Sequence, residues 1–161
     1  MGMDVYGLNP QLKSKRPKID FSDATEQERT EYFDALDLFE RDNPGYYFRN
    51  NVWWWRPLWD YVCDVCESVM SDTDAERGEY NEGYEYDAEL TAKMVALLDA
   101  DIAQNGHHLY EKKHLAEQEK AKKKEESGEI EKAWVCSYPF DPVNVEEFVD
   151  FLRNSGGFKI C

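Results

Sequence analysis

Residues 46–59 read Tyr-Tyr-Phe-Arg-Asn-Asn-Val-Trp-Trp-Trp-Arg-Pro-Leu-Trp, and this stretch decides the fold. It holds four of the five tryptophans of the chain. Because each aromatic side chain can bury roughly 150–250 Å², we expect the stretch to turn inward and anchor the core. Core packing is the first interpretation of these rings, and a ligand pocket and a protein interface are the alternatives.

A helix near 57–70 is expected to follow directly and to lie at the centre of the fold. Pro57 suits the first turn of a helix, where its missing N–H costs nothing. Apolar residues then cover most of the circumference, which is typical of a buried helix. They are Leu58, Trp59, Tyr61, Val62, Cys63, Val65, Cys66, Val69 and Met70, and the polar stripe left between them is Asp60, Asp64, Glu67 and Ser71.

Apolar residues at helical spacing predict further helices on both sides of this one. Capping residues mark where they begin and end: Ser22 or Asp23 for a helix over 24–41, Asp87 for one that stops at Asn105-Gly106, and Asn144 with Glu147 for the last. The segment 71–86 is expected to be a loop. The segment 107–132 carries a Lys-Glu run and is expected to be charged, solvated or partly disordered, and the chain then re-enters the core at 134–140.

Both ends of the chain look like short strands. Residues 3–7 and 158–161 are rich in apolar or aromatic residues, and a glycine ends the first segment and precedes the second. We expect them to pair as a minor two-stranded β ribbon. The predicted fold is therefore mainly α, with four to five helices packed around the central helix near 57–70.

Length and composition indicate one domain over 1–161. A chain of 161 residues with 42% hydrophobic residues can bury a sizeable core. Its longest apolar run is too short to cross a membrane, and its N-terminus lacks the basic and apolar segments of a signal peptide. We expect a soluble, cytoplasmic protein with no membrane partner.

The charge of the chain excludes one class of partner and favours another. The net charge is −15, from 34 acidic and 19 basic residues. Such a field repels phosphate backbones and attracts basic partners. Direct binding of nucleic acid is therefore not expected.

Candidate chemistry is sparse. Cys63 and Cys66 form a Cys-x-x-Cys pair inside an apolar helix, so we interpret them as buried structural thiols. The histidines, His107, His108 and His114, fall in a hydrophilic segment and are expected to be solvated. No phosphate loop, nucleophile elbow or histidine–glutamate metal motif is present. We predict no metal, no cofactor and no catalytic residue, and a non-enzymatic role over an enzymatic one.

Three segments together are distinctive: the opening Met-Gly-Met-Asp-Val-Tyr-Gly, the stretch Tyr-Phe-Arg-Asn-Asn-Val-Trp-Trp-Trp-Arg-Pro-Leu-Trp, and the ending Ser-Gly-Gly-Phe-Lys-Ile-Cys. The chain resembles a family of small, functionally uncharacterised bacteriophage and bacterial proteins. Relative to that family, residues 11–43 look like an insertion with one helix. Many relatives carry paired zinc-knuckle-like elements before Tyr-Pro-Phe. This chain has the Lys-Glu run there instead, so no zinc role carries over.

Two functions are compatible with these observations. The first is a phage-type accessory protein that binds and inhibits a basic host protein, such as a nucleic-acid-handling defence factor, in the host cytoplasm. Its contacts would be the acidic residues Asp60, Asp64, Glu67, Glu79, Glu82 and Glu85. The alternative is a binder of a small anionic, nucleotide-like ligand. Its contacts would be Arg49, Asn50, Asn51, Trp53 and Arg56, which can stack on a base and hold a phosphate.

Overall fold

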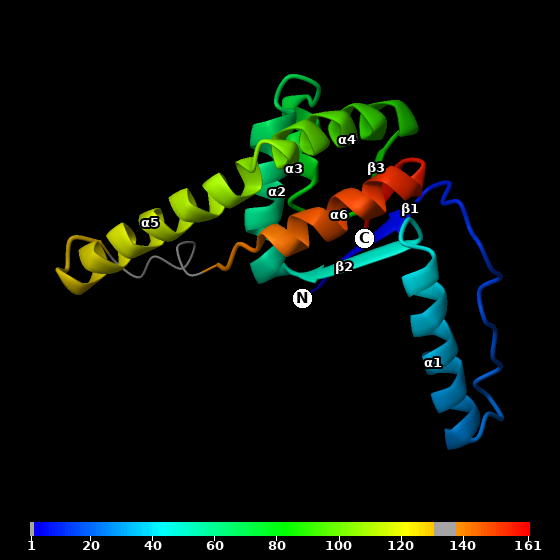
Figure 1. Cartoon of the computed structure of the whole chain (residues 1–161). Coiled ribbons are helices and arrows are strands. Elements are labelled where there is room, and N and C mark those ends of the chain that lie inside the picture. Colours follow the sequence, from blue (N-terminus) through cyan, green and yellow to red (C-terminus); the bar gives the residue numbers. More distant parts are fainter. Residues whose placement is uncertain (1, 131–137) are drawn as a thin grey trace.

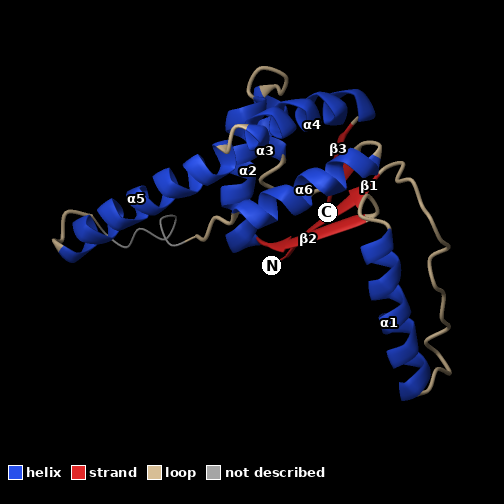
Figure 2. Ribbon diagram, viewed as in Figure 1, coloured by secondary structure: helices blue, strands red, loops and turns tan. Residues whose placement is uncertain are grey.

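The fold combines a small antiparallel sheet with helices that cover it (Figures 1 and 2). A computed structural model describes residues 2–130 and 138–161. Within these residues the elements are β1 (Gly2–Gly7), α1 (Glu26–Asp42), β2 (Tyr47–Asn51), α2 (Val52–Cys66), α3 (Asp72–Arg77), β3 (Tyr84–Tyr86), α4 (Ala88–Ala103), α5 (Gly106–Glu126), α6 (Pro142–Ser155) and β4 (Phe158–Ile160).

The predicted terminal ribbon is one part of a larger sheet. β1 and β4 pair antiparallel, with Val5 opposite Ile160, as expected. The sheet has four strands in the order β2-β1-β4-β3, however, so the prediction of a two-stranded ribbon missed β2 and β3. β2 comes from the aromatic stretch, whose Tyr and Phe residues favour strands. β3 has three residues, which is too short for a period-2 pattern to reveal it.

The sheet presents one face to the core. Along β1, Met3 and Val5 are buried, whereas Tyr6 is exposed on the other face. α6 packs against β1 and β2, α2 also reaches β1, and α4 packs on both α2 and α6. The core is therefore a layer of helices on one side of the sheet.

The central helix begins and ends earlier than predicted. α2 starts at Val52 because the Asn51 side chain accepts hydrogen bonds from the backbone N–H groups of Trp53 and Trp54, at 3.0 and 3.1 Å. Pro57 consequently lies inside the helix instead of at its first turn. α2 buries seven of its fifteen residues and α6 seven of fourteen, so these two helices share the centre.

Two other helices begin at capping residues that differ from the predicted ones, and a third begins at the predicted residue. Thr25 caps α1 through a capping box with Glu28, in place of Ser22 or Asp23. Asp141 caps α6, in place of Asn144. Asp87 caps α4 as predicted. The expected loop 71–86 contains α3 and β3.

Residues 107–126 belong to α5, which ends at Glu126 and buries His107 alone among its residues. Part of the charged segment, 131–132, and the predicted re-entry at 134–137 lie outside the described residues. Tyr138 and Phe140, where the description resumes, are buried.

α1 projects from the body as an arm (Figure 1). Phe39 is its one buried residue, whereas Phe33, which belongs to the helical pattern that predicted this helix, and the nearby Leu38 are exposed. Both side chains are about half exposed, at 52% and 49%. Within the described residues, none of the helices combines the length and apolarity needed to cross a membrane.

Candidate functional site

A pocket of about 390 Å³ lies between α2, α5 and the turn that follows α3. Aromatic side chains form much of its wall: Trp55 and Trp59 from α2, Tyr110 from α5, and Tyr138. Carboxylates surround the same space, namely Asp60 from α2, Glu79 from the turn and Glu117 from α5. Such a volume is within the range of small-ligand sites. The pocket therefore combines apolar walls with negative charge.

Hydrogen bonds hold the two indoles of the pocket in place. Trp55 Nε1 donates to the Gly78 carbonyl and Trp59 Nε1 donates to the Ala75 carbonyl, each at 2.8 Å. The rings stack with centroids 5.5 Å apart and planes within 12° of parallel. Gly78 allows this approach, because a methyl group there would overlap the Trp59 ring. The aromatic wall is thus preorganised.

The carboxylates create a negative potential in and beside the pocket. Partial burial raises the pKa of Asp60, and neighbouring Glu79 and Asp64 raise it further. Burial, and next the charges of Asp64 and Asp60, raise the pKa of Tyr110 to about 12. Additional negative charge is therefore unfavourable in the pocket. A bound cation would reduce the repulsion between the carboxylates.

Arg56, His114 and Gln118, which line the pocket, all contact Tyr138. Arg56 Nη1 lies 3.4 Å from the Tyr138 hydroxyl, and the guanidinium carbon lies 5.8 Å from the ring centroid. His114 Nε2 and Gln118 Nε2 both donate to the Tyr138 carbonyl, at 2.7 Å. Glu117 has a distant partner in Lys113, at 4.0 Å. Among the described residues Asp60 has no ion-pair partner within 4.0 Å, and neither does Glu79.

The predicted ligand residues are not brought together. Arg49 Nε lies 3.5 Å from the Asp4 carboxylate, on β2 and β1. Asn50 donates to the Asn144 side chain at 3.0 Å, and Asn51 caps α2. These three residues therefore make structural contacts.

The other two predicted ligand residues are Trp53 and Arg56. Trp53 is 46% exposed and meets Tyr138 edge to face, at 4.8 Å between ring centroids. Arg56 lines the pocket. Tyr138 is therefore the group that connects these two residues.

The predicted interaction residues divide in two. Asp60, Asp64 and Glu79 lie close together: Glu79 and Asp64 help to raise the pKa of Asp60, and after burial all three help to raise the pKa of Cys63. The others lie apart from the pocket lining: Glu67 follows the end of α2, Glu82 pairs with Arg77 at 3.2 Å, and Glu85 is opposite Lys159 across β3 and β4.

Sequence reasoning missed the part of the pocket that α5 supplies. Tyr110, His114 and Glu117 stand at spacings of four and three residues, so they share a helix face. That spacing was readable in the sequence. Many other residues of α5 are Lys or Glu, and this charge led to the interpretation of the whole segment as solvated.

The two thiols of the Cys-x-x-Cys pair are held in their protonated form. Burial, followed by the charge of Asp60, raises the pKa of the Cys63 thiol to about 12. Burial likewise raises the pKa of Cys66 to about 12. Thiolates are the reactive and metal-binding form, so these residues fit the predicted structural role.

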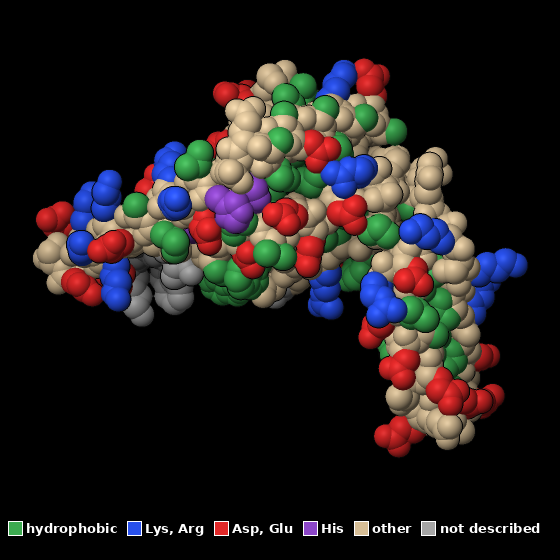
Figure 3. Space-filling model, in the orientation of Figure 1, with side chains coloured by type: hydrophobic (Ala, Val, Ile, Leu, Met, Phe, Trp, Pro, Cys, Tyr) green, Lys and Arg blue, Asp and Glu red, His purple; other side chains and the backbone are tan. Residues whose placement is uncertain are grey.

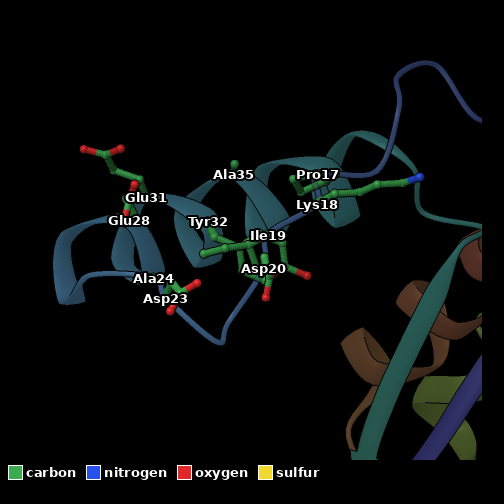
Figure 4. A pocket seen from close by; sticks show the side chains of 10 residues that line it. All are labelled: Pro17, Lys18, Ile19, Asp20, Asp23, Ala24, Glu28, Glu31, Tyr32 and Ala35. Atoms are coloured by element: carbon green, nitrogen blue, oxygen red, sulfur yellow. The ribbon is translucent and has the colours of Figure 1, made fainter.

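A second hollow lies between the arm and the extended segment before it (Figure 4). Pro17 and Ile19 from the segment face Tyr32 and Ala35 of α1. One helix and an extended chain form its walls, so no packed core fixes its shape. The pocket between α2 and α5 is the stronger candidate.

Comparisons with known proteins add no second source of information. No protein-family model, curated protein or solved structure matches the chain. The resemblance to phage and bacterial proteins stays a prediction. The candidate site is interpreted from its own geometry.

Proposed function

We propose that the protein is a non-catalytic binding protein that takes a basic side chain of a partner protein into the pocket between α2 and α5. One observation carries the proposal: Asp60 and Glu79 have no ion-pair partner among the described residues and stand beside a fixed pair of indoles. A lysine or arginine side chain offers the cation and the apolar stem that such a pocket accommodates.

Two physical effects favour a cation here. The partly exposed ring of Tyr110 can attract an ammonium or guanidinium group by about 0.5–2 kcal/mol, whereas Trp55 and Trp59, which are 0% and 1% exposed, form the buried floor beneath it. Burial is the largest cause of the raised pKa of Asp60 and repulsion from Glu79 and Asp64 comes next; a bound cation reduces that repulsion. The net charge of −15 would also steer a basic partner toward the protein at low salt.

The charge balance disfavours the nucleotide-like ligand. The pocket has three carboxylates against one guanidinium, and that guanidinium already contacts Tyr138. An anion entering it would meet Glu79 and also Asp60, whose charge Arg56 and His114 offset only in part. Inhibition of a basic, nucleic-acid-handling host protein is the role that cation capture would serve, and it depends on the identity of the partner.

Calorimetric titration with the peptide acetyl-Lys-Lys-Lys-amide tests the proposal, with AMP as the anionic probe. The variant Asp60→Asn/Glu79→Gln is expected to bind the peptide at least about tenfold more weakly, since tenfold corresponds to only about 1.4 kcal/mol and the variant removes two carboxylate charges. Asp34→Asn/Asp37→Asn on α1 is the matched control, because it removes the same charge from exposed positions.

The control separates the pocket from the overall charge of the chain. It is expected to change peptide affinity by no more than about twofold, as screened distant charges do. Equal weakening in both variants would show that the peptide binds the general acidic surface. Binding of AMP without binding of the peptide would favour the nucleotide-like alternative.

A further inference from the structure

The first turn of α5 places two adjacent histidines against α6. His107 is buried, with a side chain 3% exposed, which corrects the expectation that all three histidines are solvated. His108 is exposed next to it, and their ring centroids are 4.3 Å apart. Histidine side chains gather at one place on the surface, with acidic side chains beside them (Figure 3).

A carboxylate from α6 completes a compact group. His107 Nε2 lies 3.1 Å from Glu146 Oε1. One ligand atom from each of His107, His108 and Glu146 lies within 4.8 Å of the other two. Glu111 adds a further carboxylate oxygen, 3.8 Å from His108 Nδ1. Two imidazole nitrogens and carboxylate oxygens therefore converge from two helices.

We propose that His107, His108 and Glu146 bind a divalent cation of the zinc type. Two histidines and a carboxylate are a ligand set that holds Zn²⁺ with one position left open. Tetrahedral ligands about 2.1 Å from the ion stand roughly 3.4 Å apart. The His107–Glu146 pair already has nearly that spacing. His108 and Glu146, whose side chains are about half exposed, can rotate to complete the site around the buried His107.

The surroundings set the expected strength of binding. Nδ1 of His107 is buried and has no hydrogen-bond partner among the described residues. A metal-binding histidine usually donates this second N–H to an acceptor, whose loss lowers affinity by about 10–100-fold. We therefore expect micromolar affinity. The acidic chain concentrates cations around itself and partly offsets this loss.

This site is separate from the proposed cation pocket. None of its three ligands lines that pocket. It also differs from a thiolate site, because neither Cys63 nor Cys66 belongs to the ligand group. Zinc binding and peptide binding can thus each fail without the other.

Isothermal titration of the chelator-treated full chain with zinc chloride at pH 7.5 tests the site. One equivalent is expected to bind. His108→Ala and Glu146→Gln change exposed side chains, so both variants should fold, and each is expected to weaken binding at least about tenfold. Glu147→Gln, one residue along α6, is the matched control, and Cys63→Ser tests a thiol site. Absence of binding, or equal affinity in Glu146→Gln and Glu147→Gln, would overturn the proposal, as would loss of binding in Cys63→Ser.

Imidazole nitrogen NMR of the unmodified protein avoids a substitution of buried His107. Zinc is expected to shift the ring nitrogens of His107 and His108 and to leave His114 unchanged, because His114 lines the other site. Shifts confined to His114, or no shift at any histidine, would contradict the assignment.

Discussion

Two helices of this chain carry aromatic residues at helical spacing and end in opposite surroundings. α6 buries seven of its fourteen residues against the sheet and α4, whereas α1 buries Phe39 alone out of seventeen. The arm instead forms a local cluster, in which Phe21, Tyr32 and Phe33 contact one another. Apolar spacing thus identifies a helix, but a partner surface decides whether its apolar side is buried.

The difference predicts two levels of stability in one molecule. The body rests on aromatic packing that reaches across α2, α6 and the sheet. The arm rests on its own capping box and on a few aromatic contacts. Regions with few buried contacts open at lower free energy than the global unfolding reaction. Matched changes in the two regions should therefore differ in what they cost.

The largest expected effect is from core truncation. Phe148 is fully buried and contacts Trp55, Phe48 and Phe151, so Phe148→Ala should lower the free energy of unfolding by about 3–5 kcal/mol. Phe33→Ala, on the exposed side of α1, should cost no more than about 1 kcal/mol. Urea unfolding followed by tryptophan fluorescence measures both. Similar losses would mean that the arm is part of the cooperative core.

A smaller loss is expected where the turn after α3 meets the pocket. Gly78→Ala forces a methyl group into the Trp59 ring and should cost about 1–3 kcal/mol. It should also shift the Trp59 indole resonance. Gly83→Ala is the control, since that residue has φ +80° and open space around it. The control should lose only the free energy of unfolding that backbone strain costs. Equal shifts of the Trp59 indole resonance in both variants would contradict the tight contact between Gly78 and that ring.

Removal of the arm's cap should affect the arm alone. Thr25→Ala deletes the two hydrogen bonds that the Thr25 hydroxyl makes with Glu28 and should cost α1 about 1 kcal/mol. Amide hydrogen exchange should accelerate over 26–42 and stay unchanged in α2 and α6. Faster exchange throughout the body would show that the two regions unfold together.

The smallest effect concerns the charge in the pocket. Because burial and neighbouring acids raise the pKa of Asp60 in the folded state, its ionisation destabilises the fold at pH values above the ordinary Asp pKa. Asp60→Asn should therefore raise the urea midpoint slightly at pH 7, and the gain should disappear near pH 3, where Asp60 is protonated in both states. Asp34→Asn on α1 should show no such gain. A loss of stability at pH 7 in Asp60→Asn would mean that the carboxylate has a favourable partner.

Local signals in the sequence predicted the elements, and contacts distant in sequence explain what it missed. The terminal strands and the Asp87 cap depend on neighbouring residues and are confirmed. β2 and β3 need a partner strand to form, and the sequence pattern of either segment is compatible with a loop. The start of α2 was missed because the aromatic run concealed the capping role of Asn51.

The candidate site was predictable to a similar degree. The acidic stripe of Asp60 and Asp64 follows from helical spacing. Glu79 joins it only because α3 returns the chain toward α2 through the bonds from Trp55 and Trp59. His107 is buried because α6 covers the start of α5, and no residue near it in the sequence indicates that contact.

The most direct measurement of the central proposal is a ¹H–¹⁵N NMR titration of the indole N–H groups with N-acetyl-lysine methylamide and with its uncharged isostere, N-acetyl-norleucine methylamide. The Trp55 and Trp59 resonances should shift with the lysine derivative and stay in place with the norleucine derivative, because the ammonium group is what Asp60 and Glu79 attract. Equal shifts with both compounds, or shifts with neither, would contradict a cation-binding pocket.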